Sequence, residues 1–189
     1  MTAQTPPPSP AGAGAVRLRL RPVRRDDLDT LERWWETPEV QSRFNWFGFP
    51  PPGFLRSRFE ENGMLGDDYG NLLVELVDGT SIGDVSYNAV RHGPGEGSRA
   101  YNIGITVLPE YRGQGLGAEA QRLLADYLFA HTRVERIEAG TDVENVAEQR
   151  ALEKAGFTRE GVLRSAQFRD GAFHDMVLYS RLRGEKVPG

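Results

Sequence analysis

The residues best suited to chemistry in this sequence form a glycine-rich turn from Arg112 to Gly117, which reads Arg-Gly-Gln-Gly-Leu-Gly. A strand pattern ending at Val107 precedes it, and an amphipathic helix pattern begins at Leu116. The first amides of a helix have no acceptor within the helix, and the helix dipole places partial positive charge there. Because glycines let a ligand approach the backbone closely, the turn is suited to hold a pyrophosphate, with Arg112 adding a cation.

Other interpretations of this turn are weaker. A P-loop is excluded because no Gly-Lys-Ser/Thr follows the glycines. Gly113, Gly115 and Ala118 satisfy the dinucleotide-binding pattern G-x-G-x-x-G/A, and Glu138 lies about 20 residues on, where that pattern has an acidic residue. Against this interpretation, Pro-Glu-Tyr-Arg separates the strand from the glycines, and too few β-α-β units remain. A turn that only packs the helix on the strand is the structural alternative.

A second segment, Asn145 to Phe157, reads Asn-Val-Ala-Glu-Gln-Arg-Ala-Leu-Glu-Lys-Ala-Gly-Phe. Together the two segments resemble the two signatures of the GNAT (N-acetyltransferase) superfamily, R/Q-x-x-G-x-G/A and an Asn followed by a helix ending in Glu-Lys-x-Gly-Phe. The resemblance covers nearly all of the chain after the first 15 residues. The segments 159–164 and 175–182 resemble the branch that includes the ribosomal-protein alanine N-acetyltransferases.

The resemblance implies an acetyl-CoA-dependent N-acetyltransferase and a set of residues that bind acetyl-CoA. Backbone amides of the turn would wrap the pyrophosphate, the strand before it would pair with the pantetheine arm, and Asn145 would contact that arm through its side-chain amide. The two amides of pantetheine need such partners. The implied residues are Ile105, Thr106, Val107, Arg112, Gly113, Gln114, Gly115, Leu116, Gly117 and Asn145.

Acetyl transfer from a thioester to an amine needs a neutral amine, a donor to the carbonyl oxygen and a proton for the thiolate. We assign the carbonyl donor to the Val107 backbone N–H. The acid and base positions depart from the family pattern, which often has Glu at Asn102, Tyr at Leu152 and, in the ribosomal-protein branch, Ser at Glu148. An acyl-CoA-binding sensor with little turnover is therefore the alternative function.

Several groups are candidates for the missing general base. Asp84 and Ser86 share one face of their strand by its period of two, and we take them as catalytic candidates. Asp142 and Glu144 lie near the mouth of the next strand, and a water chain is a further route. Glu148 is expected either beside CoA or at the start of its helix.

Aromatic residues cluster where the resemblance places the acceptor side of the cleft. About half of them are expected to pack in the core, but the run from Phe44 to Phe49 lies in an expected loop. The predicted acceptor pocket contains Trp35, Phe44, Trp46, Phe47 and Phe49. Acidic neighbours would attract a cationic primary amine, on a protein N-terminus or a small molecule.

The elements that must position these groups follow from hydrophobic periodicity and turn signals. Residues 38–52 are expected to be irregular. Strands are predicted over 16–21, 71–77, 81–89, 100–107, 136–141, 158–168 and 172–181, and helices after Asp26 or Asp27 to Trp35 and over 54–61, 116–131 and 146–155. We therefore predict an α/β fold in which about four helices flank a mixed, mostly antiparallel sheet of about seven strands. The single acetyltransferase domain spans 16–183, after a disordered leader over 1–15 and before a short tail over 184–189.

Composition excludes several other classes of protein. The 189 residues contain no cysteine, so thiolate metal sites and a cysteine nucleophile are excluded, and the three histidines have no metal-site spacing. With 23 Lys+Arg against 27 Asp+Glu, nucleic acid is not the expected partner. No membrane-spanning run or signal peptide is visible, so we expect a cytoplasmic protein. Since relatives are often paired, a homodimer remains open.

Overall fold

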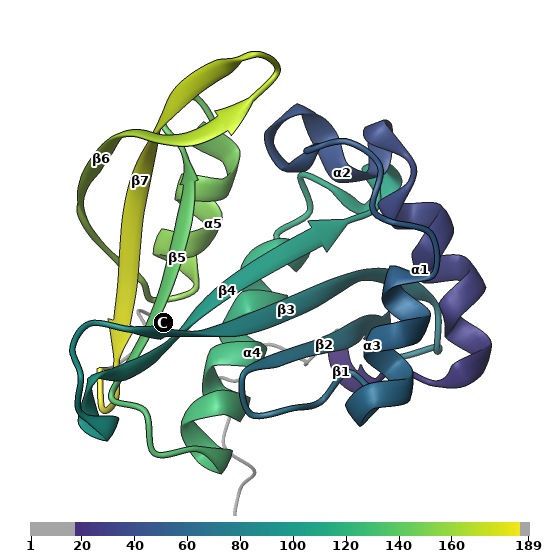
Figure 1. The fold of residues 1–189 in the computed structure, drawn as a ribbon, viewed down its shortest axis with the longest axis horizontal. Helices are drawn as coiled ribbons and strands as arrows, with labels where there is room; N and C mark the ends of the chain where they lie inside the picture. Colours follow the sequence, from purple (N-terminus) through teal and green to yellow (C-terminus); the bar gives the residue numbers. More distant parts are fainter. Residues whose placement is uncertain (1–17, 186–189) are drawn as a thin grey trace, which may run out of the picture.

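The computed structural model describes residues 18–185, which form one seven-stranded sheet with helices on both faces (Figure 1). The sheet order is β1-β2-β3-β4-β5-β7-β6. The strands are β1 Leu18–Pro22, β2 Tyr69–Leu76, β3 Ser81–Arg91, β4 Arg99–Val107, β5 Arg136–Asp142, β6 Thr158–Arg169 and β7 Ala172–Leu182. The predicted fold class is confirmed. The predicted leader over 1–15 and most of the predicted tail lie outside the described residues.

Five α-helices occur in the described residues: α1 Leu28–Trp35, α2 Pro38–Asn45, α3 Phe54–Asn62, α4 Leu116–His131 and α5 Val146–Lys154. The prediction that residues 38–52 are irregular is wrong for α2. Pro38 begins this helix, where its fixed φ fits and its missing N–H costs nothing. Within α2, Ser42 has φ 63° and ψ 165°, so the helix is kinked there.

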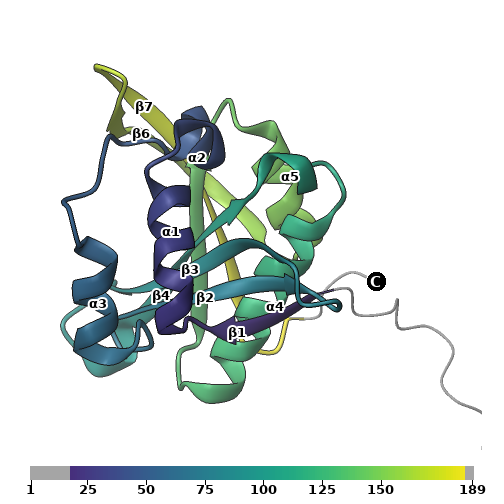
Figure 2. The same cartoon turned by 90° about the vertical axis from the view of Figure 1, so that its right-hand side faces the viewer.

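Helices cover both faces of the sheet (Figure 2), and two hydrophobic clusters hold these layers together. On one face, α1 and α3 pack on the sheet through Leu28, Leu31 and Leu55. On the other face, α4 and α5 pack on it through residues such as Leu124 and Leu152. No helix within residues 18–185 is long and apolar enough to cross a membrane.

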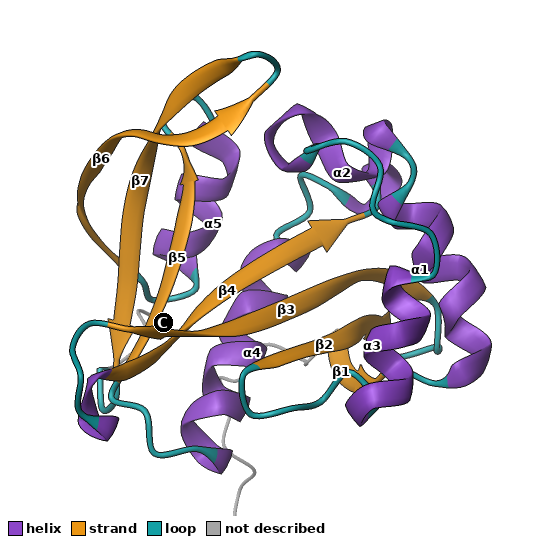
Figure 3. Ribbon diagram, in the orientation of Figure 1, coloured by secondary structure: helices purple, strands orange, loops and turns teal. Residues whose placement is uncertain are grey.

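The sheet opens between β4 and β5. β3 and β4 pair antiparallel from Gly83–Val107 to Arg91–Arg99, whereas β4 and β5 pair parallel at only two positions, Tyr101–Ile137 and Asn102–Glu138. Beyond them the two strands diverge toward α2, as Figure 3 shows. This half of the β4 edge therefore has no neighbouring strand.

Candidate active site

A cavity of about 580 Å³ lies where β4 and β5 diverge. It is bounded by α2, the free half of β4, the glycine-rich turn before α4, the end of β5 and one side of α5. The lining residues include Val40, Gln41, Ser42, Phe44, Asn45, Ile103–Val107, Tyr111, Arg112, Gly113, Gly115, Gly117, Thr141, Asn145, Glu148, Arg150 and Lys154. Most of the predicted cofactor-binding residues therefore meet in one place, although they come from separate parts of the chain.

The glycine-rich turn presents its backbone to this cavity. Gly113 and Gly115 have φ of 75° and 79°, a left-handed conformation that favours glycine, and Gly115 is the residue that precedes α4. No atom lies within 4 Å of where a Cβ on Gly113 would stand. The side chains of Gln114 and Leu116 do not line the cavity, since Gln114 donates to the Glu110 carbonyl and Leu116 is buried in the core. A contact of either residue with a ligand here would have to come from its backbone amide.

The Arg112 side chain acts as a tether in this structure. Its guanidinium donates to the carbonyls of Val107 at 2.8 Å, Glu39 at 3.2 Å and Val40 at 2.5 Å. Burial lowers the pKa of Arg112, and nearby Glu110 opposes that shift. In this structure the Arg112 side chain therefore links the turn to α2 and β4, and its role as a cation for a pyrophosphate stays a prediction.

The free edge of β4 carries backbone groups that point into the cavity. Leu108 N donates to Ile82 O at 2.9 Å, and in an antiparallel pair the backbone groups alternate in direction. Ile105 and Val107 accordingly face away from β3. Their carbonyls accept from the Asn45 side chain at 3.2 Å and from Arg112. The N–H groups of Ile105 and Val107 face the same way, toward the cavity.

Asn145 and Glu148 stand together at the start of α5. Asn145 Oδ1 accepts from the Glu148 backbone N–H at 3.3 Å and so caps the helix. Glu148 is the only acidic residue among the described residues that line the cavity. Burial raises the pKa of the Glu148 carboxyl to about 7, although a hydrogen bond from Gln121 opposes the shift. A carboxyl group with this pKa can exchange protons near neutral pH.

Asp84 and Ser86, the predicted catalytic pair, do not line the cavity. Asp84 is buried on the sheet face covered by α1 and α3, and its Oδ2 accepts from Asn71 Nδ2 at 2.9 Å. Desolvation raises the pKa of Asp84 to about 6, with Asn71 and Trp35 opposing that shift. Because period two gives the shared face but not what covers it, the sequence could not place this pair relative to the cavity.

Only one of the five predicted acceptor-pocket aromatics, Phe44, lines the cavity. Trp35 packs against Phe54, with ring centroids 6.0 Å apart. Trp46 and Phe49 stack edge to face at 5.2 Å, away from the cavity. Phe47 and Phe49 are 59% and 78% exposed. This side of the cavity is lined by α2, whose polar residues Gln41, Ser42 and Asn45 were not predicted from the sequence because that segment was expected to be irregular.

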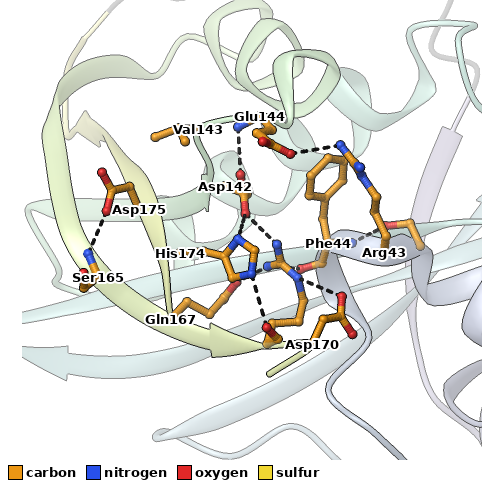
Figure 4. Close-up of polar contacts among 12 residues, drawn as sticks. Arg43, Phe44, Asp142, Val143, Glu144, Ser165, Gln167, Asp170, His174 and Asp175 are labelled. Atoms are coloured by element: carbon orange, nitrogen blue, oxygen red, sulfur yellow. Dashed lines mark hydrogen bonds and ion pairs between the residues drawn. The ribbon is translucent and has the colours of Figure 1, made fainter. Parts of the chain in front are cut away.

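An ion-pair network joins α2, β5 and the β6–β7 hairpin beside the cavity (Figure 4). Arg169 is buried and binds Asp142 Oδ2 at 2.5 Å, and it also donates to the Phe44 carbonyl at 3.3 Å. His174 Nδ1 lies 3.3 Å from the same Asp142 oxygen. Although burial opposes it, hydrogen bonds from the Glu144 N–H and Arg169 hold the pKa of Asp142 below its usual range.

Two further candidates for the general base, Asp142 and Glu144, belong to this network. Asp142 is held by Arg169 and does not line the cavity, and Glu144 forms an exposed ion pair with Arg43 at 3.1 Å. Among the positions that depart from the family pattern, Leu152 is fully buried in the core and Asn102 lies at the start of the divergence of β4 from β5. Neither substitution adds an acid or base to the cavity. Within residues 18–185, no group of three or more acidic or histidine residues is arranged to hold a metal ion.

The sequence and the fold are similar to those of known acetyltransferases. Residues 17–158 match the family model described as an acetyltransferase (GNAT) domain. The chain is 28% identical over 172 residues to the uncharacterised N-acetyltransferase p20 of Bacillus licheniformis, which covers 89% of this chain and 94% of that protein.

Two solved structures share the fold. One is a spermidine N-acetyltransferase from Vibrio cholerae in complex with CoA and spermine, with a TM-score of 0.76 and 23% identity over 89% of this chain and 97% of that chain. The other is a ribosomal L7/L12 alpha-N-protein acetyltransferase in complex with coenzyme A, with a TM-score of 0.74 and 20% identity over 91% and 97%. Since the matched domain spans well over half of the sequence, the chain belongs to the GNAT family of N-acetyltransferases.

Proposed function

We propose that this protein transfers an acetyl group from acetyl-CoA directly to a primary amine, with CoA bound in the cavity between β4 and β5. The observation that carries the proposal is the cavity itself. It brings Asn145, from a distant part of the sequence, together with the free edge of β4 and the glycine-rich turn that follows that edge. These three segments present the groups that a pyrophosphate and a chain with two amides require.

The cavity offers matching partners along the length of CoA. Backbone amides from Gly113 to Gly117 would hold the pyrophosphate at the start of α4, where the helix dipole favours negative charge. Ile105 and Val107 would pair with the pantetheine arm as an added strand does, because their backbone groups face the cavity. The Asn145 side chain would complete the arm's hydrogen bonds from the opposite wall.

Acetyl-CoA supplies an acetyl group activated as a thioester. In the reaction, the amine nitrogen bonds to the carbonyl carbon, the carbon–sulfur bond breaks, the amine loses a proton and the sulfur gains one. The Val107 N–H would donate to the oxygen as negative charge grows on it. Glu148 would accept the proton from the amine, in place of Asp84 and Ser86, because its carboxyl lines the cavity and has a raised pKa.

The acceptor amine would enter beside α2, where Phe44 supplies an apolar wall and Gln41 and Ser42 supply polar groups. The structural neighbours are named for acceptors as different as spermidine and a ribosomal protein. We therefore propose a primary amine as the acceptor, on a small molecule or a protein N-terminus.

Thiol release tests the proposed activity. The purified full-length chain is incubated with acetyl-CoA and a panel of peptides, polyamines, aminoglycosides and amino acids, and free CoA thiol is measured over time. At least one amine should accelerate thiol release over the rate without acceptor. Tight acetyl-CoA binding with no acceleration by any amine would favour the sensor function, and absence of CoA binding would contradict the cavity assignment.

Asn145 allows the binding role of its side chain to be separated from its role as a helix cap. Asn145→Ser keeps an oxygen that can cap α5 but removes the amide donor, whereas Asn145→Ala removes both. We expect both variants to weaken CoA binding about fivefold to tenfold, because a hydrogen bond to the pantetheine arm is lost, and only Asn145→Ala to lower thermal stability. Calorimetric titration and thermal melts measure the two effects, and unchanged CoA affinity in Asn145→Ser would refute the assigned contact.

A further inference from the structure

We propose that Arg150 and Lys154 on α5 form a subsite for the 3′-phosphate of CoA, so that the protein discriminates CoA from 3′-dephospho-CoA. This inference rests on the proposed binding of CoA in the cavity. The remaining part of the cavity wall, beyond the turn, the β4 edge and Asn145, is one side of α5.

The two side chains belong to one stripe of α5 that faces the cavity. Ala147, Arg150, Ala151 and Lys154 all line it, and their spacing of three and four residues places them on one side of the helix. The opposite side buries Leu152 in the core. The two alanines let a ligand approach the helix, and the two cations mark the part of the stripe that lies beyond Asn145.

Arg150 and Lys154 have no partner for their charges among the described residues. Neither side chain forms a hydrogen bond or an ion pair within residues 18–185, and both are exposed. Arg112 is the third cation that lines the cavity, and its guanidinium already donates hydrogen bonds to three backbone carbonyls. Among the described lining residues, the cationic groups available to an anionic ligand are therefore the two on α5.

The chemistry of CoA matches this division. CoA carries a pyrophosphate and, separately, a phosphate on the 3′-oxygen of its ribose. The glycine-rich turn already offers backbone amides to the pyrophosphate. The C-terminal half of α5 offers no such amides and carries partial negative charge, so an anion bound there needs cationic side chains. A guanidinium and an ammonium one helical turn apart are suited to a phosphate dianion.

Calorimetric titration of two ligands tests the subsite without relying on turnover. CoA and 3′-dephospho-CoA are each titrated into the full-length wild type, Arg150→Gln, Lys154→Gln and the double variant. The control is Arg133→Gln, which replaces an exposed cation that has no hydrogen bond or ion pair within residues 18–185. Arg133 lies just past the far end of α4, a helix that begins at the glycine-rich turn and rises about 24 Å over its length. Thermal melts verify that each variant is folded.

We expect the wild type to bind CoA about tenfold more tightly than 3′-dephospho-CoA, and added salt to narrow this ratio. The double variant should bind both ligands with the affinity that the wild type has for 3′-dephospho-CoA. Each single variant should show a smaller ratio of CoA affinity to 3′-dephospho-CoA affinity than the wild type. Arg133→Gln should keep the wild-type ratio.

Four results would overturn the subsite. A double variant that keeps the tenfold ratio shows that the cations do not contact the 3′-phosphate. A double variant that weakens both ligands equally assigns the cations to the pyrophosphate instead. A wild type that binds both ligands equally well removes the subsite while leaving the proposed function intact, whereas a wild type that binds neither ligand refutes both.

Discussion

The Glu148 carboxyl is expected to set the pH dependence of the reaction. With a pKa of about 7, it is ionised and able to accept a proton above that pH and is protonated below it. The kcat/KM of the wild type should therefore rise as pH increases through about 7. Deprotonation of the amine acceptor adds a second rise at higher pH.

Replacing this carboxyl tests its role. Glu148→Gln should lower kcat/KM by about 10²-fold and abolish the rise near pH 7, while CoA affinity changes little. Glu144→Gln is the matched control, since Glu144 is exposed and paired with Arg43 outside the cavity. A wild-type rate that falls above pH 7 would show instead that Glu148 must be protonated to act, which contradicts its assignment as the base.

Asp84 is expected to make the stability of the protein depend on pH. Its Oδ1 and the Oδ1 of Asn71 are both buried without a hydrogen-bond partner among the described residues, while Asn71 Nδ2 donates to Asp84 Oδ2. A proton on Asp84 would remove the buried negative charge and add a donor to this side chain. Since the pKa of Asp84 is raised to about 6, the folded state holds this proton where the unfolded chain does not, and stability should fall as pH rises from about 4 to about 6.

Asp84→Asn supplies that donor permanently, because its amide has the shape of the protonated carboxyl. We expect the free energy of unfolding at pH 7 to increase by about 2 to 3 kcal/mol, and its decline between pH 4 and 6 to become shallower. Urea denaturation across this pH range measures both effects. A variant less stable than the wild type at pH 7 would contradict the role assigned to the proton.

At the scale of elements, the position of α2 depends on the hairpin formed by β6 and β7. Arg169 reaches from that hairpin to Asp142 at the end of β5 and to the Phe44 carbonyl in α2. Phe44 lines the cavity, so the Arg169 side chain that pairs with Asp142 also holds the wall of the proposed acceptor site. The hairpin is in turn defined locally by Asp170 and Gly171, whose φ of 50° and 79° suit the two-residue turn that the sequence predicts.

Breaking the Arg169–Asp142 pair should cost stability because it leaves one buried charge without its partner. Arg169→Met and Asp142→Asn should each lower the free energy of unfolding by about 3 to 5 kcal/mol, and the double variant should lose less than the sum. Arg169→Met should also raise KM for the amine more than it weakens CoA binding, since it releases α2.

The exposed pair of Arg43 and Glu144 is the control for this comparison. A double-mutant cycle on that pair should yield a coupling below about 1 kcal/mol. Additive losses at Arg169 and Asp142 in urea denaturation would show that the buried pair is not coupled.

At the scale of the whole molecule, the cavity separates two parts of the sheet that pair directly at only two positions, between β4 and β5. A ligand that contacts the β4 edge, the start of α4 and α5 binds only the folded arrangement of these elements. At 100 times its Kd, such a ligand adds about 2.7 kcal/mol to the free energy of unfolding.

For a chain of this length, that free energy raises Tm by about 5 to 10 °C. Thermal melts with and without acetyl-CoA measure the shift, and adenosine serves as the control ligand that lacks both pantetheine and phosphates. An unchanged Tm at saturating acetyl-CoA would contradict binding across the opening.

Much of this protein could be inferred from the sequence because the features concerned are local. The left-handed glycines of the 112–117 turn, the apolar stripe of α4 and the Asp-Gly turn of the last hairpin depend on neighbouring residues, and the structure contains all three. The prediction from periodicity was wrong at α2, because Pro38 was expected to interrupt a helix and instead begins one.

The tertiary structure alone decided which side chains meet. The strand pattern placed Asp84 and Ser86 on one face, but only the packing of α1 and α3 shows that Asp84 is buried there, outside the cavity. Likewise, the aromatic run from Phe44 to Phe49 contributes one ring to the cavity, and Glu148 lines it as its only carboxylate among the described residues. The physical reason is that the cavity exists because β4 and β5 part after two residue pairs, and that long-range geometry leaves no periodicity in either strand.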